Sequence, residues 1–472
     1  MAATTTSKPR VHRPPATERQ PALPPGPRLP VLAQTLLWAF APTWLLDRCA
    51  REVGEAFTLT FWPSGLRLAM LSDPQAIKTV FTAPADVAPS GARMSPIAPV
   101  LGASSVLILT GPEHMRQRKL LLPPFHGERM LEYEQTMAEA TRANMATWPL
   151  GRAMRLQRHT RLITLEVILR AVFGVESERM GPLKAAITDL FEPPQLPTIL
   201  RALLRGPRDG RPGGAIGRGL DHLDVLLYEE IARRRAASDV AERADILSLL
   251  LGARDEDGQA MRDEELRDEL VTLLLAGHET TSTSVAWAVE RLARHPQKLA
   301  RLVAEIDAGE GDEYLTAVVH ETLRVRPVVP IVVRVLTREL EVGGRKLPAG
   351  TRVVPCIYLT NRNPRVYDEP DAFRPERFLG DEGGQDVNTF AWIPFGGGIR
   401  RCIGASFALL EMKVLLRTML AELEPRPADG RRLRLGAWSP RGERIRRRAV
   451  TLVPAQGASV VWQRRGGSRG AG

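Results

Sequence analysis

The stretch Phe395–Gly404, which reads FGGGIRRCIG, places a cysteine at the end of a glycine-rich loop. Such a loop can fold closely over a flat group, because glycine has no side chain and accepts unusual dihedral angles. Backbone N–H groups, the start of the helix that follows and the nearby Arg400 can all stabilise a thiolate at Cys402. The pattern therefore indicates a deprotonated thiol that binds a metal.

Two other interpretations of this loop compete with a metal-binding thiol. A cysteine beside a tight turn is commonly a buried, inert side chain, and for an isolated cysteine that is the better interpretation. A phosphate-binding loop would need Lys-Ser or Lys-Thr directly after the glycines, between a strand and a helix, and the sequence lacks this pattern. The choice between a metal-binding and an inert thiol therefore depends on the rest of the chain.

The loop resembles the haem-binding signature of the cytochrome P450 superfamily, and the matching positions are Phe395, Gly398, Arg400, Cys402 and Gly404. The resemblance covers about residues 25–455 and is strongest to soluble bacterial members. It implies a single domain that is mainly α-helical with small β sheets. It also implies a haem b cofactor, with Cys402 as the axial ligand of the iron and Phe395, Gly398 and Gly404 shaping the loop around it.

A second motif places Glu321 and Arg324 three residues apart on an expected helix, where the two charges can pair. Such pairs are common on solvated helices and prove little alone. About fifty residues later an irregular segment, Phe373–Phe378, contains Arg377. By the resemblance, Glu321, Arg324 and Arg377 form a structural triad that fixes the scaffold on the haem side. We therefore expect these residues to act in folding and not in catalysis.

A third motif, AGHETT at residues 276–281, lies midway along an expected helix. A hydroxyl inside a helix can bond back to a carbonyl and bend the helix, and Gly277 removes bulk at the same place. Together these residues could open a groove for dioxygen, although a glycine beside a charged surface pair would be the ordinary explanation. By the resemblance, Thr280 stabilises activated oxygen and Glu279 helps to deliver protons. His278 is expected to be incidental and not a ligand.

A fourth group is cationic. His114 and Arg118 lie four residues apart on an expected helix and therefore reach the same side. Arginine is suited to binding carboxylates through two hydrogen bonds, although any one of these cations could simply be a surface charge. By the resemblance, His114, Arg118, Arg334 and Arg400 bind the haem propionates.

Apolar periodicity predicts the main elements of the fold. The strongest helix is expected over 263–294, where three acidic residues suit the first turn and Pro296 follows the end. Further helices are expected at 74–82, 112–122, within 127–175, and at 217–235, 296–308, 312–325 and 404–423. A strand pair is expected within 56–72, a hairpin within 338–358, and loops over 86–108 and 192–216.

Composition bounds the domain organisation and the class of function. Residues 1–30 are expected to be a flexible Pro-rich segment, 31–460 the haem domain, and 461–472 a basic flexible tail. The net charge is +11, but residues 426–472 carry +10 and residues 1–30 carry +4, which leaves −3 for the body. This distribution argues against nucleic-acid binding, which needs a basic face on the folded domain. Three widely spaced cysteines predict neither a disulfide framework nor a zinc site.

Apolar residues of several segments are expected to line a substrate pocket, and a hydrophobic small molecule such as a fatty acid, terpenoid, steroid or polyketide would suit it. The expected lining residues are Ile97, Val100, Leu101, Val106, Leu275, Ala276, Val328, Val329 and Ile331. The segment at 192–216 would serve as a lid.

The resemblance implies a monooxygenase that inserts one atom of O2 into its substrate by hydroxylation or epoxidation. Electrons would come from a separate ferredoxin or flavodoxin with its reductase, for which Arg116, Lys119 and Lys413 are candidate docking cations. We expect a cytoplasmic monomer without a membrane span. Two alternatives are a non-catalytic haem-binding sensor and a peroxide-driven peroxygenase, although the latter would be expected to lack the intact pair Glu279–Thr280.

Overall fold

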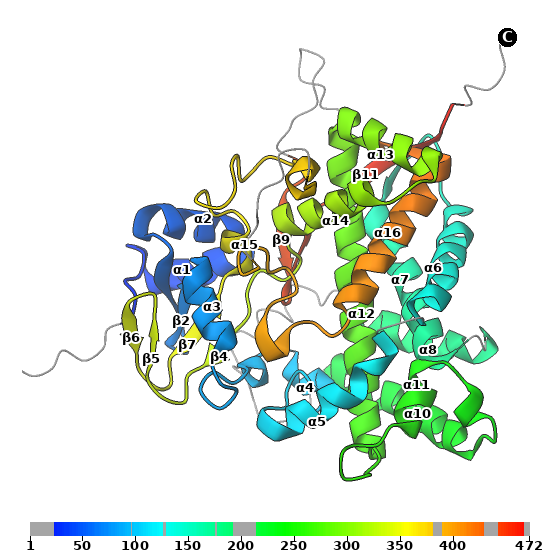
Figure 1. Ribbon diagram of the computed structural model, residues 1–472, viewed down its shortest axis with the longest axis horizontal. Coiled ribbons are helices and arrows are strands. Elements are labelled where there is room, and N and C mark those ends of the chain that lie inside the picture. Colours follow the sequence, from blue (N-terminus) through cyan, green and yellow to red (C-terminus); the bar gives the residue numbers. More distant parts are fainter. Residues whose placement is uncertain are drawn as a thin grey trace, which may run out of the picture.

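The computed structural model describes residues 23–95, 97–125, 129–174, 177–191, 214–380, 389–428 and 442–466. Most helices gather in one part of the molecule, and a smaller part rich in β structure lies beside them (Figure 1). The expectation of a mainly α-helical single domain with small sheets is confirmed. In the described part of the chain, no helix has both the length and the apolar character that crossing a membrane requires.

The helices occupy most of the described chain. They are α1 (Val31–Phe40), α2 (Pro42–Val53), α3 (Pro74–Thr82), α4 (Ala98–Leu101), α5 (Gly111–Leu121), α6 (Arg129–Met145), α7 (Leu156–Phe173), α8 (Ser177–Phe191), α10 (Gly214–Ala236), α11 (Ile246–Gly252), α12 (Asp263–Arg294), α13 (Pro296–Ala308), α14 (Glu313–Val325), α15 (Ile357–Thr360) and α16 (Ala405–Glu422).

The strands form four small sheets. They are β1 (Ala56–Phe61), β2 (Leu66–Leu71), β3 (Ala153–Arg155), β4 (Arg334–Val335), β5 (Leu340–Val342), β6 (Arg345–Leu347), β7 (Arg352–Pro355), β8 (Leu423–Pro427), β9 (Ile445–Arg448), β10 (Thr451–Pro454) and β11 (Ser459–Arg464). Their spatial orders are β1-β2-β7-β4, β3-β11-β8, β10-β9 and β5-β6.

The long helix α12 runs through the helical part, and α7 packs along it (Figure 1). The Glu265 carboxylate accepts a hydrogen bond from the Arg262 N–H at 2.8 Å, which satisfies one of the free donors at the start of α12. Hydroxyls of α7 reach carbonyls of α12: Thr160 donates to Ser282 and Thr164 donates to His278, each at 2.9 Å. These bonds fix α7 against the middle of α12, where the motif AGHETT (residues 276–281) lies.

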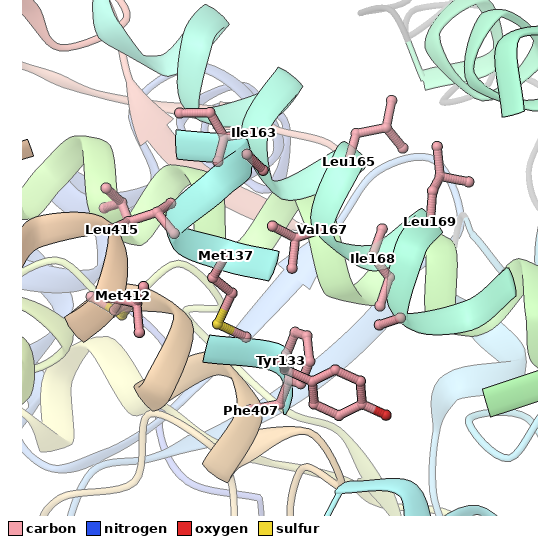
Figure 2. Close-up of a cluster of buried hydrophobic side chains, with 14 of the residues drawn as sticks. Tyr133, Met137, Ile163, Leu165, Val167, Ile168, Leu169, Phe407, Met412 and Leu415 are labelled. Atoms are coloured by element: carbon pink, nitrogen blue, oxygen red, sulfur yellow. The ribbon is translucent and has the colours of Figure 1, made fainter. Parts of the chain in front are cut away.

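The main apolar core joins α6, α7 and α16 (Figure 2). The rings of Tyr133 and Phe407 meet edge to face, with their centroids 5.3 Å apart. Met137, Leu415 and Ile163 are almost fully buried beside them. Burial of each such side chain contributes about 1.5–3 kcal/mol, so this core holds α16 firmly behind the Cys402 loop.

Two parts of the chain differ from the expected domain boundaries. Val461–Arg464 were expected to begin a flexible tail, but they belong to β11, which pairs with both β3 and β8. Residues 23–30 were assigned to the flexible lead-in, yet the Pro25 carbonyl accepts a hydrogen bond from the Thr58 N–H at 3.0 Å. The remainder of the expected lead-in and tail, and residues 192–213 of the expected lid, lie outside the described residues.

Candidate active site

The glycine-rich loop holds Cys402 just before α16. The Cys402 N–H donates to the Phe395 carbonyl at 3.0 Å, which closes the loop on itself. Gly398 adopts a φ of +66°, and an added Cβ there would overlap the carbonyl oxygen of Phe81 in α3. Only glycine satisfies both conditions, so the loop can lie directly on the end of α3.

The surroundings of the Cys402 sulfur act on its ionisation in opposite directions. Cys402 is exposed by surface area, yet the protein atoms packed around its sulfur limit its hydration and raise the pKa of the thiol, which is the largest effect. The N–H of Gly404 and the positive charges of Arg118 and Arg401 lower the same pKa. These three groups are placed to stabilise a thiolate at Cys402.

The structure brings together the four expected propionate ligands. The buried imidazole of His114 has its pKa lowered to about 4, first by burial and then by the charges of Arg400, Arg118 and Arg334. The pKa of Arg400 is lowered to about 10 by burial and by the other two arginines. Three cations from α5, β4 and the Cys402 loop therefore face one another.

This group of positive charges fits a ligand that carries two carboxylates. Within the described residues no carboxylate pairs with Arg118, Arg334 or Arg400, and the buried Nδ1 of His114 has no hydrogen-bond partner. A cavity between α3 and the Cys402 loop is lined by Arg334, Arg400 and Phe81 among others. Cations that are wholly or partly buried are costly without a counter-charge, so their gathering fits a group that carries two carboxylates, such as the propionates of a haem.

The motif AGHETT at residues 276–281 of α12 is arranged partly as expected. The Thr280 hydroxyl donates to the Ala276 carbonyl at 2.7 Å. The Glu279 carboxylate is paired with Arg161 of α7 and Arg448 of β9, each at 3.1 Å. Burial raises the pKa of Glu279, while Arg448 and Arg161 lower it. These two arginine partners were not predicted, because they lie more than a hundred residues away from Glu279 in opposite directions along the chain.

Gly277 has a different role from the one expected. A Cβ at Gly277 would lie 2.9 Å from Cδ1 of Ile168 in α7, so the missing side chain allows α7 and α12 to approach closely. It faces the helix interface and not the exposed side of α12, where Ala276 lies. His278 is buried, and its Nδ1 lies 2.8 Å from the Leu274 carbonyl. Burial lowers the pKa of His278 to about 4, so the side chain is neutral.

The expected triad forms a buried ion-pair cluster. Arg324 makes two hydrogen bonds to Glu321, at 2.7 and 2.9 Å, and the Arg377 Nε lies 3.2 Å from the same carboxylate. Arg324 also donates to the carbonyls of Asn361, Pro370 and Ala372. The cluster thereby ties α14 to the irregular segment that leads towards Cys402.

The nine expected pocket residues fall into two groups. Ala276 is exposed, and five others are partly exposed: Ile97, Val100, Leu275, Val329 and Ile331. Leu101, Val106 and Val328 are buried, with exposed fractions of 1%, 6% and 6%. In this conformation the three buried side chains offer little surface to a ligand and act mainly in packing.

The three expected docking cations are all engaged in ion pairs. Arg116 binds Asp255 and Glu265, and it is only partly exposed. Lys119 pairs with Glu256, and Lys413 with Asp312. Arg401, beside Cys402, is exposed and has no ion-pair partner in the described part of the chain. Arg401 was not among the predicted docking cations, although its place next to Cys402 in the sequence could have indicated it.

Known proteins resemble this chain over almost its whole length. The sequence model described as cytochrome P450 matches residues 24–435. A Mycobacterium tuberculosis protein named cytochrome P450 135B1 is 42% identical over 446 residues, which cover 93% of this chain and 91% of that protein. Another, named cytochrome P450 137, is 39% identical over 461 residues, which cover 96% and 92%.

Solved structures share the fold at lower sequence identity. A retinoic acid-bound cyanobacterial CYP120A1 has a TM-score of 0.77 at 24% identity and covers 94% of this chain and 100% of its own. The haem domain of cytochrome P450DA has a TM-score of 0.78 at 24% identity and covers 95% and 98%. The chain belongs to the cytochrome P450 family and is a haem-dependent monooxygenase.

Proposed function

We propose that this protein holds haem b through Cys402 and inserts one atom of O2 into a hydrophobic small molecule by hydroxylation or epoxidation. The observation that carries the proposal is the meeting of Cys402 with three arginines, one buried and two partly exposed, that have no carboxylate partner among the described residues. A flat, dianionic, metal-containing group satisfies both features together. Family membership supports the same assignment.

Different residues would hold different parts of the haem. The Cys402 sulfur would ligate the iron, while His114, Arg118, Arg334 and Arg400 would bind the propionates. When bound, the haem supplies dioxygen binding, O–O cleavage and transfer of one oxygen atom to the substrate. The reaction consumes O2, two electrons and two protons, and it yields the oxygenated substrate and one water.

The protons must pass through residues of α12. The Thr280 hydroxyl, which donates to Ala276 at 2.7 Å, can rotate to hold a proton at its Oγ towards the reacting oxygen. Glu279 can supply that proton only if its carboxylate leaves one of its two arginine partners. We therefore assign Thr280 the direct role, and Glu279 the role of a donor that is released intermittently.

The substrate is a hydrophobic small molecule, such as a fatty acid, terpenoid, steroid or polyketide. Electrons come from a separate ferredoxin or flavodoxin with its reductase, and the protein works as a monomer in the cytoplasm. A non-catalytic haem sensor would not need the acid and hydroxyl pair at Glu279 and Thr280. A peroxide-driven enzyme would not need proton delivery, so the same pair favours the O2-dependent reaction.

The test is the visible spectrum of the reduced protein under carbon monoxide, for the wild type and Cys402→Ser. A strongly red-shifted Soret band is expected in the wild type and is expected to be lost in the variant, because only a thiolate ligand produces it. Cys356→Ser is the matched control, since Cys356 is a buried cysteine distant in sequence from the loop. A histidine-type band in all three proteins would refute the proposal.

The sensor and peroxygenase alternatives are separated by turnover. With a surrogate ferredoxin and reductase, a monooxygenase consumes NADPH faster when a substrate is added, and oxygenated product appears. A sensor would bind the compound without product formation. A peroxygenase would form product from hydrogen peroxide and not from NADPH.

A further inference from the structure

A second cavity, of about 200 Å³, lies in the β-rich part of the molecule. It is bounded by the start of β1, the end of β2, the start of α3 and the β5–β6 hairpin, which lies beside α3 (Figure 1), and we refer to it as the hairpin cavity. Its lining residues differ from those of the cavity at the Cys402 loop. The two cavities lie at opposite ends of α3, because Asp73 and Ala76 line one, whereas Val80 and Phe81 line the other.

The floor of the hairpin cavity is apolar. It is formed by side chains with exposed fractions of 4% or less, which are Leu71, Ala76, Val342 and Leu347. Apolar atoms that border an empty space lose the dispersion contacts they would make with a neighbour. An apolar cavity of about 150 Å³ can hold a benzene molecule. The hairpin cavity therefore has room for an apolar group about the size of one aromatic ring.

Two walls of the hairpin cavity are held close together. Gly343 and Gly344 have φ values of +56° and +72°, as a two-residue hairpin turn of this kind requires. A Cβ added at Gly343 would lie 3.6 Å from the Cβ of Ala76, so the turn lies against α3. The Asp73 carboxylate accepts a hydrogen bond from the Ala76 N–H at 2.7 Å and thereby caps α3. These contacts fix the hairpin relative to the start of the helix.

The wall formed by Glu55 is also fixed. Asn363 donates to one oxygen of the Glu55 carboxylate at 2.7 Å, and Arg365 lies 2.9 Å from the other oxygen. The Glu55 carbonyl accepts from the Ser72 N–H at 2.9 Å. The Glu55 carboxylate therefore compensates the charge of Arg365, and both of its oxygens are already engaged.

Arg345 brings a cation to the hairpin cavity that is not compensated in this way. It lines the cavity from β6, is exposed, and makes no ion pair within the part of the chain that the structure describes. Its cross-strand neighbour Val342 carries no charge. The one other charged lining residue, Asp73, is engaged at the start of α3, where the helix dipole stabilises its carboxylate. The cavity thus combines an apolar floor with an available guanidinium at its edge.

We propose that the hairpin cavity is a second binding site, which takes a small monocarboxylate. Its apolar part, the size of one ring or a short hydrocarbon chain, would lie on the floor, and its carboxylate would pair with Arg345. A guanidinium is suited to this pairing, because it can donate two hydrogen bonds to one carboxylate. A dicarboxylate would fit less well, since its second charge would face the apolar floor. The inference goes beyond the proposed function and does not depend on it.

Two compounds of nearly equal size, 4-fluorobenzoate and 4-fluorobenzyl alcohol, test the proposal by fluorine NMR on the haem-containing protein. The protein is first saturated with 4-phenylimidazole, a ligand of ferric haem, so that neither compound enters the haem site. We expect the acid to bind with a Kd of about 1 mM or below, and the alcohol about fivefold or more weakly than the acid.

Arg345→Gln tests the role of the cation. It should weaken binding of the acid by about fivefold or more and leave binding of the alcohol unchanged. Lys346→Gln is the matched control, because Lys346 is the next residue of the same hairpin and is exposed, but does not line the cavity. Equal effects of the two variants would mean a general response to surface charge and would overturn the proposal.

Ala56→Leu tests the place of binding independently of charge. Ala56 lines the hairpin cavity at the start of β1 and is partly exposed, so a larger side chain there would occupy part of the space. Both compounds should bind about tenfold more weakly to this variant. Thermal unfolding of the variant shows whether it retains the fold.

The outcomes separate this inference from the proposed function. Absence of binding by the acid at about 20 mM, or binding that neither Arg345→Gln nor Ala56→Leu weakens, would overturn the second site. Equal affinities for the acid and the alcohol would overturn the assignment of a carboxylate ligand. A wild-type protein without the red-shifted carbon monoxide band would instead overturn the proposed function and leave the results on the hairpin cavity unaffected.

Discussion

We predict that single residues of the group formed by His114, Arg118, Arg334 and Arg400 contribute to the affinity for haem. Arg118 approaches the Cys402 sulfur closely enough to lower its pKa, and it has no ion-pair partner in the described chain. Arg118→Gln removes one charge-assisted contact, so haem should leave the protein about 10–100 times faster. Transfer of haem to apomyoglobin measures this rate.

The neighbouring Lys119 offers the control for that prediction. Its ammonium group pairs at the surface with Glu256, and 57% of its side chain is exposed. Lys119→Gln should leave the rate of haem loss unchanged, because exposed ion pairs contribute little. If both variants lost haem equally fast, Arg118 would not be a propionate ligand.

In α16, the residue Glu411 makes the stability of the fold depend on pH. Glu411 is buried, and burial raises its pKa well above the usual range, while the nearby Thr281 hydroxyl lowers it only in part. Since the folded pKa exceeds the unfolded one, its contribution is complete at low pH and is lost as pH rises through the folded pKa. Glu411 should therefore contribute a fall of the urea midpoint with rising pH.

Glu411→Gln removes this titration and should flatten the decline of the urea midpoint with pH. Glu422, which is exposed at the end of the same helix, provides the comparison. Glu422→Gln should keep the wild-type slope. A slope that is identical in all three proteins would show that Glu411 does not titrate differently in the folded and unfolded states.

At the scale of elements, the packing of α7 on α12 depends on Gly277. Gly277→Ala gains about 1 kcal/mol of helix propensity, but its Cβ would lie 2.9 Å from Ile168 Cδ1, and overpacking costs about 1–3 kcal/mol. The variant should therefore be destabilised by up to about 2 kcal/mol. Thermal or urea unfolding measures the change.

Ile168→Val removes the obstructing methyl group and tests this explanation. In that background Gly277→Ala should be neutral or stabilising, so the two changes should couple by about 1 kcal/mol or more. Additive effects would mean that the contact between these two residues does not limit the approach of the helices.

The elements also show what local sequence can predict. The expected helices at 263–294 and 296–308 agree with α12 and α13, because acidic residues and Pro296 mark their ends within the chain itself. β11 was missed because its strand conformation depends on β3, some three hundred residues earlier. α4 was missed for a related reason, since its four residues are held by packing on α12.

The candidate active site shows the same contrast between features marked in the local sequence and features that depend on distant residues. Cys402 and the two residues of the triad that share α14 could be singled out as candidates, since each motif is contiguous in sequence. The partners of Glu279 could not be predicted, because α7 and β9 meet α12 only in the folded chain. The misjudged role of Gly277 has the same origin: the neighbour of its missing side chain belongs to another helix.

At the scale of the whole molecule, we predict that the electron carrier docks on the surface around Cys402. Arg401 is exposed there, whereas Arg116 is occupied by Asp255 and Glu265. Arg401→Glu should raise the KM for an acidic ferredoxin about fivefold or more at low ionic strength, with a smaller effect on kcat. Steady-state NADPH oxidation with varied ferredoxin measures both constants.

Arg116→Glu distinguishes docking from structure. It places a third acidic group beside Asp255 and Glu265, so it should lower thermal stability and leave the KM for the ferredoxin nearly unchanged. An unchanged KM in Arg401→Glu, or an effect that does not weaken with added salt, would exclude Arg401 as a docking cation.

The place of β11 in its sheet has a consequence for biosynthesis. Ser459–Arg464 lie between β3 and β8, so neither strand can find this partner until residue 464 has left the ribosome. Until residues 459–464 have been made, β3 keeps an open edge that other chains could join. A substitution that disrupts β11 would leave the edges of both β3 and β8 open and make the protein a target for chaperones and proteases.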